Sequence, residues 1–95
     1  MRIISKKKIK EFGAKHPDAK AALDEWYTKT RHASWQGFED VKQTFPQVDR
    51  YGCCYIFDIG AYRLITWIVF EFYTVYTRTI LTHKEYDRKG WQNEC

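Results

Sequence analysis

The sequence contains few of the residues that build disulfide-rich or zinc-binding domains. Among its 95 residues are three cysteines, and two of them, Cys53 and Cys54, are neighbours whose side chains would point to opposite faces of a strand. No pair has the CxxC spacing that begins a zinc site, and the three positions suggest no disulfide framework. We therefore expect Cys53, Cys54 and Cys95 to be free thiols in a reducing cytoplasm.

Long hydrophobic stretches are also missing. The longest uncharged apolar run, Leu64 to Phe70, is much shorter than the roughly 20 residues that a helix needs to cross a bilayer. The N-terminus carries charge without the apolar segment of a signal peptide. These features predict a cytoplasmic protein that has no membrane partner.

Several motifs of phosphate-binding and hydrolytic enzymes are absent. The chain has no GxGxxG or Walker loop, no GxSxG, no HExxH and no acidic cluster that could hold magnesium against a phosphate. Hydrolysis by a metal-activated water is therefore disfavoured, and we expect neither a metal nor another cofactor.

Aromatic and basic residues are abundant by comparison. Hydrophobic residues make up 44% and aromatic residues 18% of the chain, enough to predict a single folded domain over residues 1–95. The formal charge is +4, and its excess lies in residues 1–31, where nine Lys or Arg stand against four Asp or Glu. A basic face favours phosphate-bearing or acidic partners, although a solvated helix surface would show the same charge.

Helical spacing of apolar residues characterises the first half of the chain, after a short strand expected at Met1–Ile4. Ser5 is expected to cap the first helix with its hydroxyl, and Pro17 to end it. Asp18 is expected to cap the second helix, whose apolar residues recur with the least interruption. The three helices predicted from this spacing cover residues 6–15, 19–30 and 38–45.

Alternating and continuous apolar residues replace helical spacing after a turn expected at Asp49–Gly52. Gly60 and Ala61 are suited to a tight hairpin turn. The strand after this turn carries large apolar groups on both faces, so we expect it at the centre of the sheet with helices over one side. The predicted strands are Cys53–Ile59, Tyr62–Phe70 and Phe72–Leu81.

A short helix is predicted over residues 83–88, directly after the last strand. Thr82 and Glu85 have the spacing of a capping box, in which each side chain accepts a hydrogen bond from the other residue's backbone N–H. The box fixes three polar side chains, at positions i, i+3 and i+4, to the end of the strand. These side chains are His83, Tyr86 and Asp87.

Two arginines, Arg63 and Arg78, lie inside predicted strands. A charge is costly there unless it is paired or reaches a solvent-lined groove. If the strands are neighbours, the two guanidinium groups could converge on an anion such as a phosphate. Ordinary ion pairs are the alternative, for which the sequence offers Asp58, Glu71 and Asp87 as partners.

The residues after the last strand permit acid–base chemistry. His83 can act as a base or an acid near neutral pH, or serve as a hydrogen-bonded structural group. Tyr86 can donate a proton, stack on a base, or simply pack. Cleavage of RNA by its own neighbouring 2′-OH needs a base, an acid and cations but no metal. His83, Tyr86 and the two arginines would be sufficient for that reaction.

Several motifs spread over nearly the whole chain point to a known family. They are the opening MRIISKK, FGAKHPDA at 12–19, the WY pair of the second helix, Trp35 with Phe38, the VDR segment, YRLI at 62–65 and THKEYDRKGW at 82–91. YRLI and the last motif are the most specific. In these motifs the chain resembles the HigB toxins of bacterial toxin-antitoxin modules, within the RelE-like superfamily of mRNA interferases.

This resemblance implies an α+β fold, in which N-terminal helices pack on a small, mainly antiparallel sheet that ends in a short C-terminal helix. It also implies metal-independent cleavage of mRNA, usually on the ribosome. The implied partner is a HigA-like helix-turn-helix antitoxin, and the toxin would contact DNA only indirectly, through this antitoxin. The catalytic residues implied are Arg63, Arg78, His83, Tyr86 and Asp87. The residues expected to bind RNA are Lys6, Lys7, Lys8, Lys10 and Lys84.

Two other hypotheses remain open from the sequence. The basic helix and aromatic strands would also suit a module that binds RNA or a partner protein without cleaving anything. A thiol-dependent enzyme using Cys53 or Cys54 is a third, weaker hypothesis.

Overall fold

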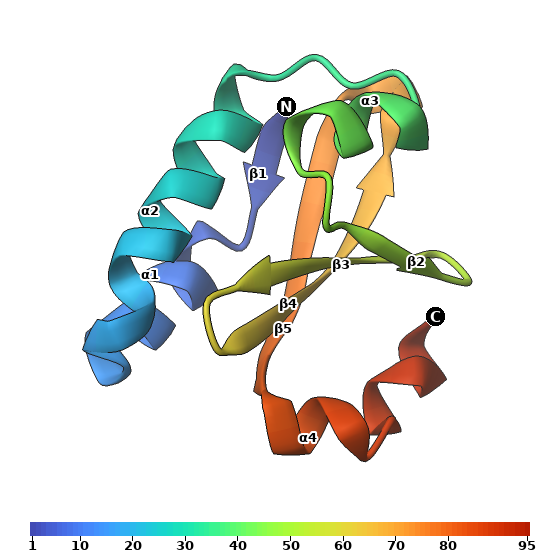
Figure 1. The fold of residues 1–95 in the computed structure, drawn as a ribbon. Helices are drawn as coiled ribbons and strands as arrows, with labels where there is room; N and C mark the ends of the chain where they lie inside the picture. Colours follow the sequence, from blue (N-terminus) through green and yellow to red (C-terminus); the bar gives the residue numbers. More distant parts are fainter.

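Five strands form one sheet in the order β1-β5-β4-β3-β2 (Figure 1). The computed structural model describes all of residues 1–95. Strand β1 pairs with β5 in parallel, and the other neighbours pair antiparallel. The two-faced apolar strand β4 lies at the centre, as its sequence predicted. The strands are β1 (Arg2–Ile4), β2 (Asp49–Tyr51), β3 (Cys54–Ile59), β4 (Tyr62–Val69) and β5 (Thr74–Thr82).

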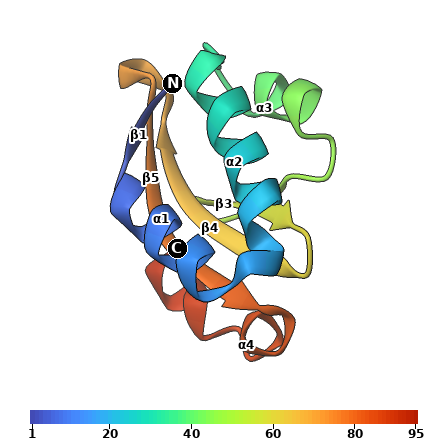
Figure 2. The same cartoon turned by 90° about the vertical axis from the view of Figure 1, so that its left-hand side faces the viewer.

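Four helices and two short 3-10 turns complete the molecule, and the α+β prediction is confirmed. Helices α2 and α3 lie over one side of the sheet (Figure 2), while α4 continues from the end of β5. No helix is long and apolar enough to cross a membrane. The elements are α1 (Lys6–Lys15), α2 (Pro17–His32), α3 (Phe38–Thr44), α4 (His83–Asp87), η1 (Phe70–Phe72) and η2 (Gly90–Glu94).

The main core lies between the helices and the sheet. The apolar side of α2 places Leu23 and Trp26 against the strands, and both side chains are almost fully buried. Trp26 meets the Phe57 ring edge to face, with ring centroids 5.4 Å apart. Leu64, at the centre of β4, belongs to the same cluster. Burial of these large side chains supplies most of the free energy that holds the helices to the sheet.

The opposite face of the sheet is covered by the C-terminal segment. Ile56 of β3 and Ile65 of β4 pack there with Trp91 of η2, in a second and smaller cluster. The two faces of β4 therefore belong to different cores, because successive side chains of a strand point to opposite sides. The predicted catalytic side chains lie on or beside this second face.

Two of the three predicted side-chain caps were wrong. Ser5 has a left-handed backbone, with φ 68°, and its side chain makes no capping hydrogen bond. Its carbonyl instead accepts a hydrogen bond from the Thr77 hydroxyl at 2.9 Å, which ties the tight β1–α1 turn to β5. Helix α2 begins one residue before Asp18, at Pro17, because a first helical residue needs no N–H donor. The Asp18 carboxylate accepts from the Tyr62 hydroxyl at 2.9 Å.

The strand boundaries also needed correction. Residues 49–51 form the edge strand β2 rather than a turn, and the reversal falls on Gly52, whose φ of 56° is in the left-handed region. Strand β5 begins at Thr74, two residues later than predicted, because η1 and a left-handed Tyr73 occupy the preceding turn. The hairpin turn at Gly60 is as predicted.

A β-bulge interrupts the pairing of β4 with β5. Ile65 pairs with Thr79, whereas the next residue of β4, Thr66, pairs with Thr77. Arg78 is thus the extra residue of β5, and bulges commonly redirect a side chain in this way. This local irregularity gives Arg78 surroundings unlike those of Arg63.

Candidate functional site

Arg63 is held at the end of the β3–β4 hairpin. Its Nε lies 3.1 Å from Oδ1 of Asp58, the residue opposite it on β3. One terminal nitrogen donates to the Tyr62 carbonyl at 3.0 Å. The guanidinium also lies over the Tyr86 ring, 5.7 Å from its centroid. The hairpin register thus sets the direction of Arg63, and its contact with Tyr86 joins β4 to α4.

Tyr86 is supported from behind by Trp91. Their rings stack with centroids 5.1 Å apart and an interplanar angle of 8°. The Trp91 indole N–H also donates to the Tyr86 carbonyl at 2.9 Å. Partial burial raises the pKa of the Tyr86 phenol, and the nearby Asp49 carboxylate adds to this, while Arg63 opposes it. The phenol is therefore protonated at neutral pH, and it releases its proton less readily than an exposed tyrosine.

His83 and Asp87 face water on α4. Nε2 of His83 lies 3.4 Å from Oδ2 of Asp87, and the two side chains are 67% and 62% exposed. The predicted capping box is present: the Glu85 N–H donates to the Thr82 hydroxyl, and the Thr82 N–H donates to the Glu85 carboxylate at 3.0 Å. The hydrogen bond that the Glu85 carboxylate accepts from the Thr82 N–H lowers the pKa of Glu85. The imidazole therefore sits on a fixed helical turn and remains open to a substrate.

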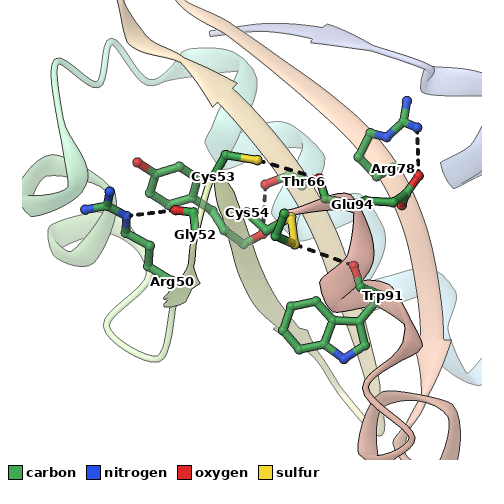
Figure 3. Close-up of a disulfide and its surroundings, with 10 residues drawn as sticks. Arg50, Gly52, Cys53, Cys54, Thr66, Arg78, Trp91 and Glu94 are labelled. Carbon is green, nitrogen blue, oxygen red and sulfur yellow. Dashed lines mark hydrogen bonds and ion pairs between the residues drawn. A yellow bond between two sulfur atoms is a disulfide. The ribbon is translucent and has the colours of Figure 1, made fainter.

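Arg78 occupies a separate position, and its side chain is 31% exposed against 22% for Arg63. Its guanidinium lies 4.1 Å from the centroid of the Trp67 ring. It also donates to the Glu94 carboxylate at 3.0 Å (Figure 3). The Arg78 carbonyl accepts from the Lys8 ammonium at 2.9 Å. Two buried donors in this contact, the Arg78 Nε and the Trp67 indole nitrogen, have no hydrogen-bond partner.

The structure brings some of the predicted catalytic residues together and separates another. Arg63 is opposite Leu81 in the sheet, two residues before His83, so the arginine and α4 lie at the same end of the molecule. Arg63 contacts Tyr86, and His83 contacts Asp87. Arg78 lies further back along β5. The two guanidinium groups do not share an anion here, because each has its own carboxylate partner.

The lysines predicted to bind RNA are distributed over two regions. Lys6 lies over the Tyr27 ring, 5.1 Å from its centroid, and Lys7 is 3.8 Å from the Glu11 carboxylate on the exposed surface of α1. Lys8, which is exposed, reaches β5. Lys10 is exposed on α1 and Lys84 on α4. Their binding of RNA stays a prediction.

The expectation of three free thiols was wrong for two of them. Cys54 and Cys95, which are 41 positions apart in the sequence, form a disulfide with Cα atoms 5.3 Å apart (Figure 3). Sequence spacing could not reveal this bond, because only the folding of η2 back onto β3 brings the two residues together. Cys53 is free and exposed. The bonded Cys54 is not available as the nucleophile of a thiol-dependent enzyme.

Sequence reasoning missed the aromatic residues that support the polar ones. Trp67 lies against Arg78 and Trp91 against Tyr86, and neither was singled out. Trp67 shares the strand face of Arg63 by alternation, which was an available signal. Trp91 belongs to the THKEYDRKGW motif, but its distance from Tyr86 in sequence gave no reason to expect stacked rings. Glu94, the partner of Arg78, had no sequence signal at all.

Comparison with known proteins adds a family relationship to this geometry. Residues 19–89 match the family described as HigB_toxin, RelE-like toxic component of a toxin-antitoxin system. The mRNA interferase toxin HigB of Escherichia coli (strain K12) is 29% identical over 92 residues, which cover 92% of this chain and 88% of that protein. The mRNA interferase HigB of Shigella flexneri gives the same values. A second mRNA interferase HigB, from Escherichia coli O6:H1, is 29% identical over 93 residues, or 93% of this chain and 90% of that protein.

Proposed function

Because the chain belongs to the HigB family of RelE-like toxins, we propose that it is a metal-independent endoribonuclease that cleaves mRNA, on the ribosome, and is neutralised by a HigA-like antitoxin. The observation that carries this proposal is the contact of Arg63 with Tyr86, at the end of the sheet where α4 also carries His83. These residues belong to the two most specific motifs of the chain and lie inside the matched range. A cation, an acid and a base are thus held on adjacent, rigid elements.

The proposed reaction uses the substrate's own ribose as the nucleophile. His83 removes the proton from the 2′-OH, the 2′ oxygen attacks phosphorus, and the bond from phosphorus to the 5′ oxygen breaks. Tyr86 gives its proton to that leaving oxygen. The products are a 2′,3′-cyclic phosphate and a 5′-hydroxyl, so the reaction consumes no water in this step.

The neighbouring charges stabilise this reaction in distinct ways. Asp87 holds Nε2 of His83, which leaves Nδ1 for the substrate, and its charge stabilises the imidazolium that forms. Arg63 faces the phosphate, whose negative charge grows more crowded in the transition state. Arg78 adds positive charge from further along the sheet. The exposed lysines of α1 and α4 would hold the backbone of RNA or of the ribosome, an attachment that weakens steeply with salt.

Primer extension on mRNA from cells that express the chain tests the proposal. Discrete new 5′ ends are expected with the unaltered chain, and none with His83→Ala, whose circular dichroism should be unchanged because the side chain is exposed. Growth arrest without new 5′ ends would contradict cleavage and favour the module that only binds. New ends that persist in His83→Ala and in Arg63→Ala would refute the assigned roles.

A further inference from the structure

The last four residues of the sequence form a cap over the second face of the sheet. This C-terminal cap, residues 92–95, is fastened by the disulfide and by the ion pair of Glu94 with Arg78 (Figure 3). The Cys53 N–H donates to the Cys95 carbonyl at 3.2 Å. A Cβ on Gly52 would collide with that same carbonyl, so the cap follows the β2–β3 turn closely.

Beside the cap lies a pair of side chains whose chemistry suits a nucleotide. The Arg78 guanidinium is stacked over the Trp67 ring, and an arginine on an indole offers a fork for phosphate beside a flat surface for a base. The Glu94 carboxylate already fills the anion position on this fork. Two donor atoms of the pair, the Arg78 Nε and the Trp67 indole nitrogen, are buried without a hydrogen-bond partner, which is energetically costly. An anion from the chain itself thus occupies a place that an RNA phosphate fits.

We propose that Arg78 and Trp67 form a subsite for one nucleotide of single-stranded RNA, which the C-terminal cap occupies and the Cys54–Cys95 disulfide keeps closed. The proposal rests on the proposed function for the identity of the ligand. It adds Trp67 as a binding residue beside Arg78. Reduction of the disulfide releases Glu94 from Arg78 and opens the subsite.

The opening does not dismantle the rest of the site. Trp91, immediately before the cap, is 8% exposed and donates its indole N–H to the Tyr86 carbonyl. Its ring is also held between those of Tyr86 and Tyr51, two residues outside the disulfide. Only residues 92–95 therefore move on reduction, and Arg63 keeps its contact with Tyr86 in the oxidised and the reduced protein.

The reduction requires a dithiol protein or small dithiol as reductant. Cys54 is fully buried while Cys95 is partly exposed, so a reductant thiolate attacks the Cys95 sulfur and Cys54 leaves as a thiolate that takes up a proton. The second thiol of the reductant then attacks the reductant sulfur that is bonded to Cys95. This step releases Cys95 as a thiol. The two electrons come from the reductant, which becomes a disulfide.

The test measures the affinity of the full chain for a short single-stranded DNA oligonucleotide, which lacks the 2′-OH and cannot be cleaved by the proposed reaction. Fluorescence anisotropy is recorded for the oxidised and the reduced protein. Alkylation followed by intact mass measurement fixes the state, with one modified cysteine expected before reduction and three after. We expect binding about tenfold tighter after reduction, because one base gains a stacking surface and one phosphate gains Arg78.

Variants separate the parts of this proposal. Cys95→Ser should bind tightly without reductant, whereas the matched control Cys53→Ser should keep the redox dependence, since Cys53 lies outside the disulfide. Glu94→Gln should tighten binding by the oxidised protein several-fold, and Trp67→Leu should abolish the gain on reduction. Circular dichroism of each variant reports its fold.

Equal affinity of the oxidised and reduced proteins would overturn the subsite, as would three reactive thiols in protein prepared with an oxidant. New 5′ ends on mRNA together with equal affinities would leave the proposed ribonuclease standing and remove only the subsite. A redox-dependent affinity without any cleavage would support the subsite and contradict the ribonuclease.

Discussion

Arg63 and Arg78 are the same kind of residue on the same face of one sheet, yet their surroundings differ. Arg63 contacts Asp58, which lies opposite it in the β3–β4 hairpin, and Tyr86 of α4. Arg78 is held by Trp67 and by Glu94, which returns from the end of the sequence. Both arginines therefore have a carboxylate partner, but only the partner of Arg78 comes from the C-terminal segment, which a disulfide holds in place.

The largest expected effect concerns the C-terminal cap beside Arg78. Cys95→Ser should lower the free energy of unfolding by about 4 kcal/mol under oxidising conditions, because the disulfide closes a loop of 41 residues in the unfolded chain. Urea unfolding measured by circular dichroism gives this value. Cys53→Ser is the control and should change it by less than about 0.5 kcal/mol. A stability equal to that of the unaltered chain would mean that the cap is not fastened.

The role of Arg63 is tested by Arg63→Ala. We expect the rate of RNA cleavage to fall about 100-fold or more, because the variant removes a donor that faces the transferring phosphate. Asp58→Asn keeps the arginine and removes only its carboxylate partner, so its rate should stay within about tenfold. If the two variants lost the same activity, the ion pair rather than the guanidinium would be the feature that matters.

The helix that carries the acid and base can be weakened from outside the site. Thr82→Ala removes the capping hydroxyl of α4 and should cost about 1 kcal/mol of stability. Thr82→Ser retains the hydroxyl and is the matched control. Chemical denaturation measures both, and an unchanged alanine variant would show that α4 is held by Trp91 alone.

The smallest effect is a shift in pH dependence. Burial raises the pKa of Tyr86 above its ordinary value of 10.0, so its acid function should persist beyond that pH. The preference of the folded state for the protonated phenol is complete below pH 10 and is lost as the pH rises through the folded pKa. Spectrophotometric titration, compared with Tyr86→Phe, should assign this ionisation. A tyrosine titrating below 10 at this position would contradict the described burial.

Local features explain which parts of the fold could be predicted from the sequence. The period of α2, the two-faced β4, the Gly60 turn and the Thr82 capping box each depend on residues close together in the chain. The wrong caps at Ser5 and Asp18 have a different origin, because tertiary hydrogen bonds from Thr77 and Tyr62 decide those positions.

The candidate site divides in the same way. Arg63, His83, Tyr86 and Asp87 came from motifs and helical spacing, and the register of β4 with β5 brings them to one end of the sheet. The surroundings of Arg78 depend on a β-bulge and on the Cys54–Cys95 disulfide, whose cysteines are 41 positions apart. Neither leaves a pattern in the sequence, so the disulfide was missed and Glu94 was not considered.

The central claim is that a base and an acid on α4, beside Arg63, drive attack by the substrate's own 2′-OH. Chemical analysis of the ends of the cleaved RNA tests it most directly. The account predicts 5′-hydroxyl fragments and 2′,3′-cyclic phosphate ends, and no cleavage where a single 2′-deoxynucleotide replaces the residue before the cut. Fragments bearing 5′-phosphates, or a cut at the deoxy position, would contradict it.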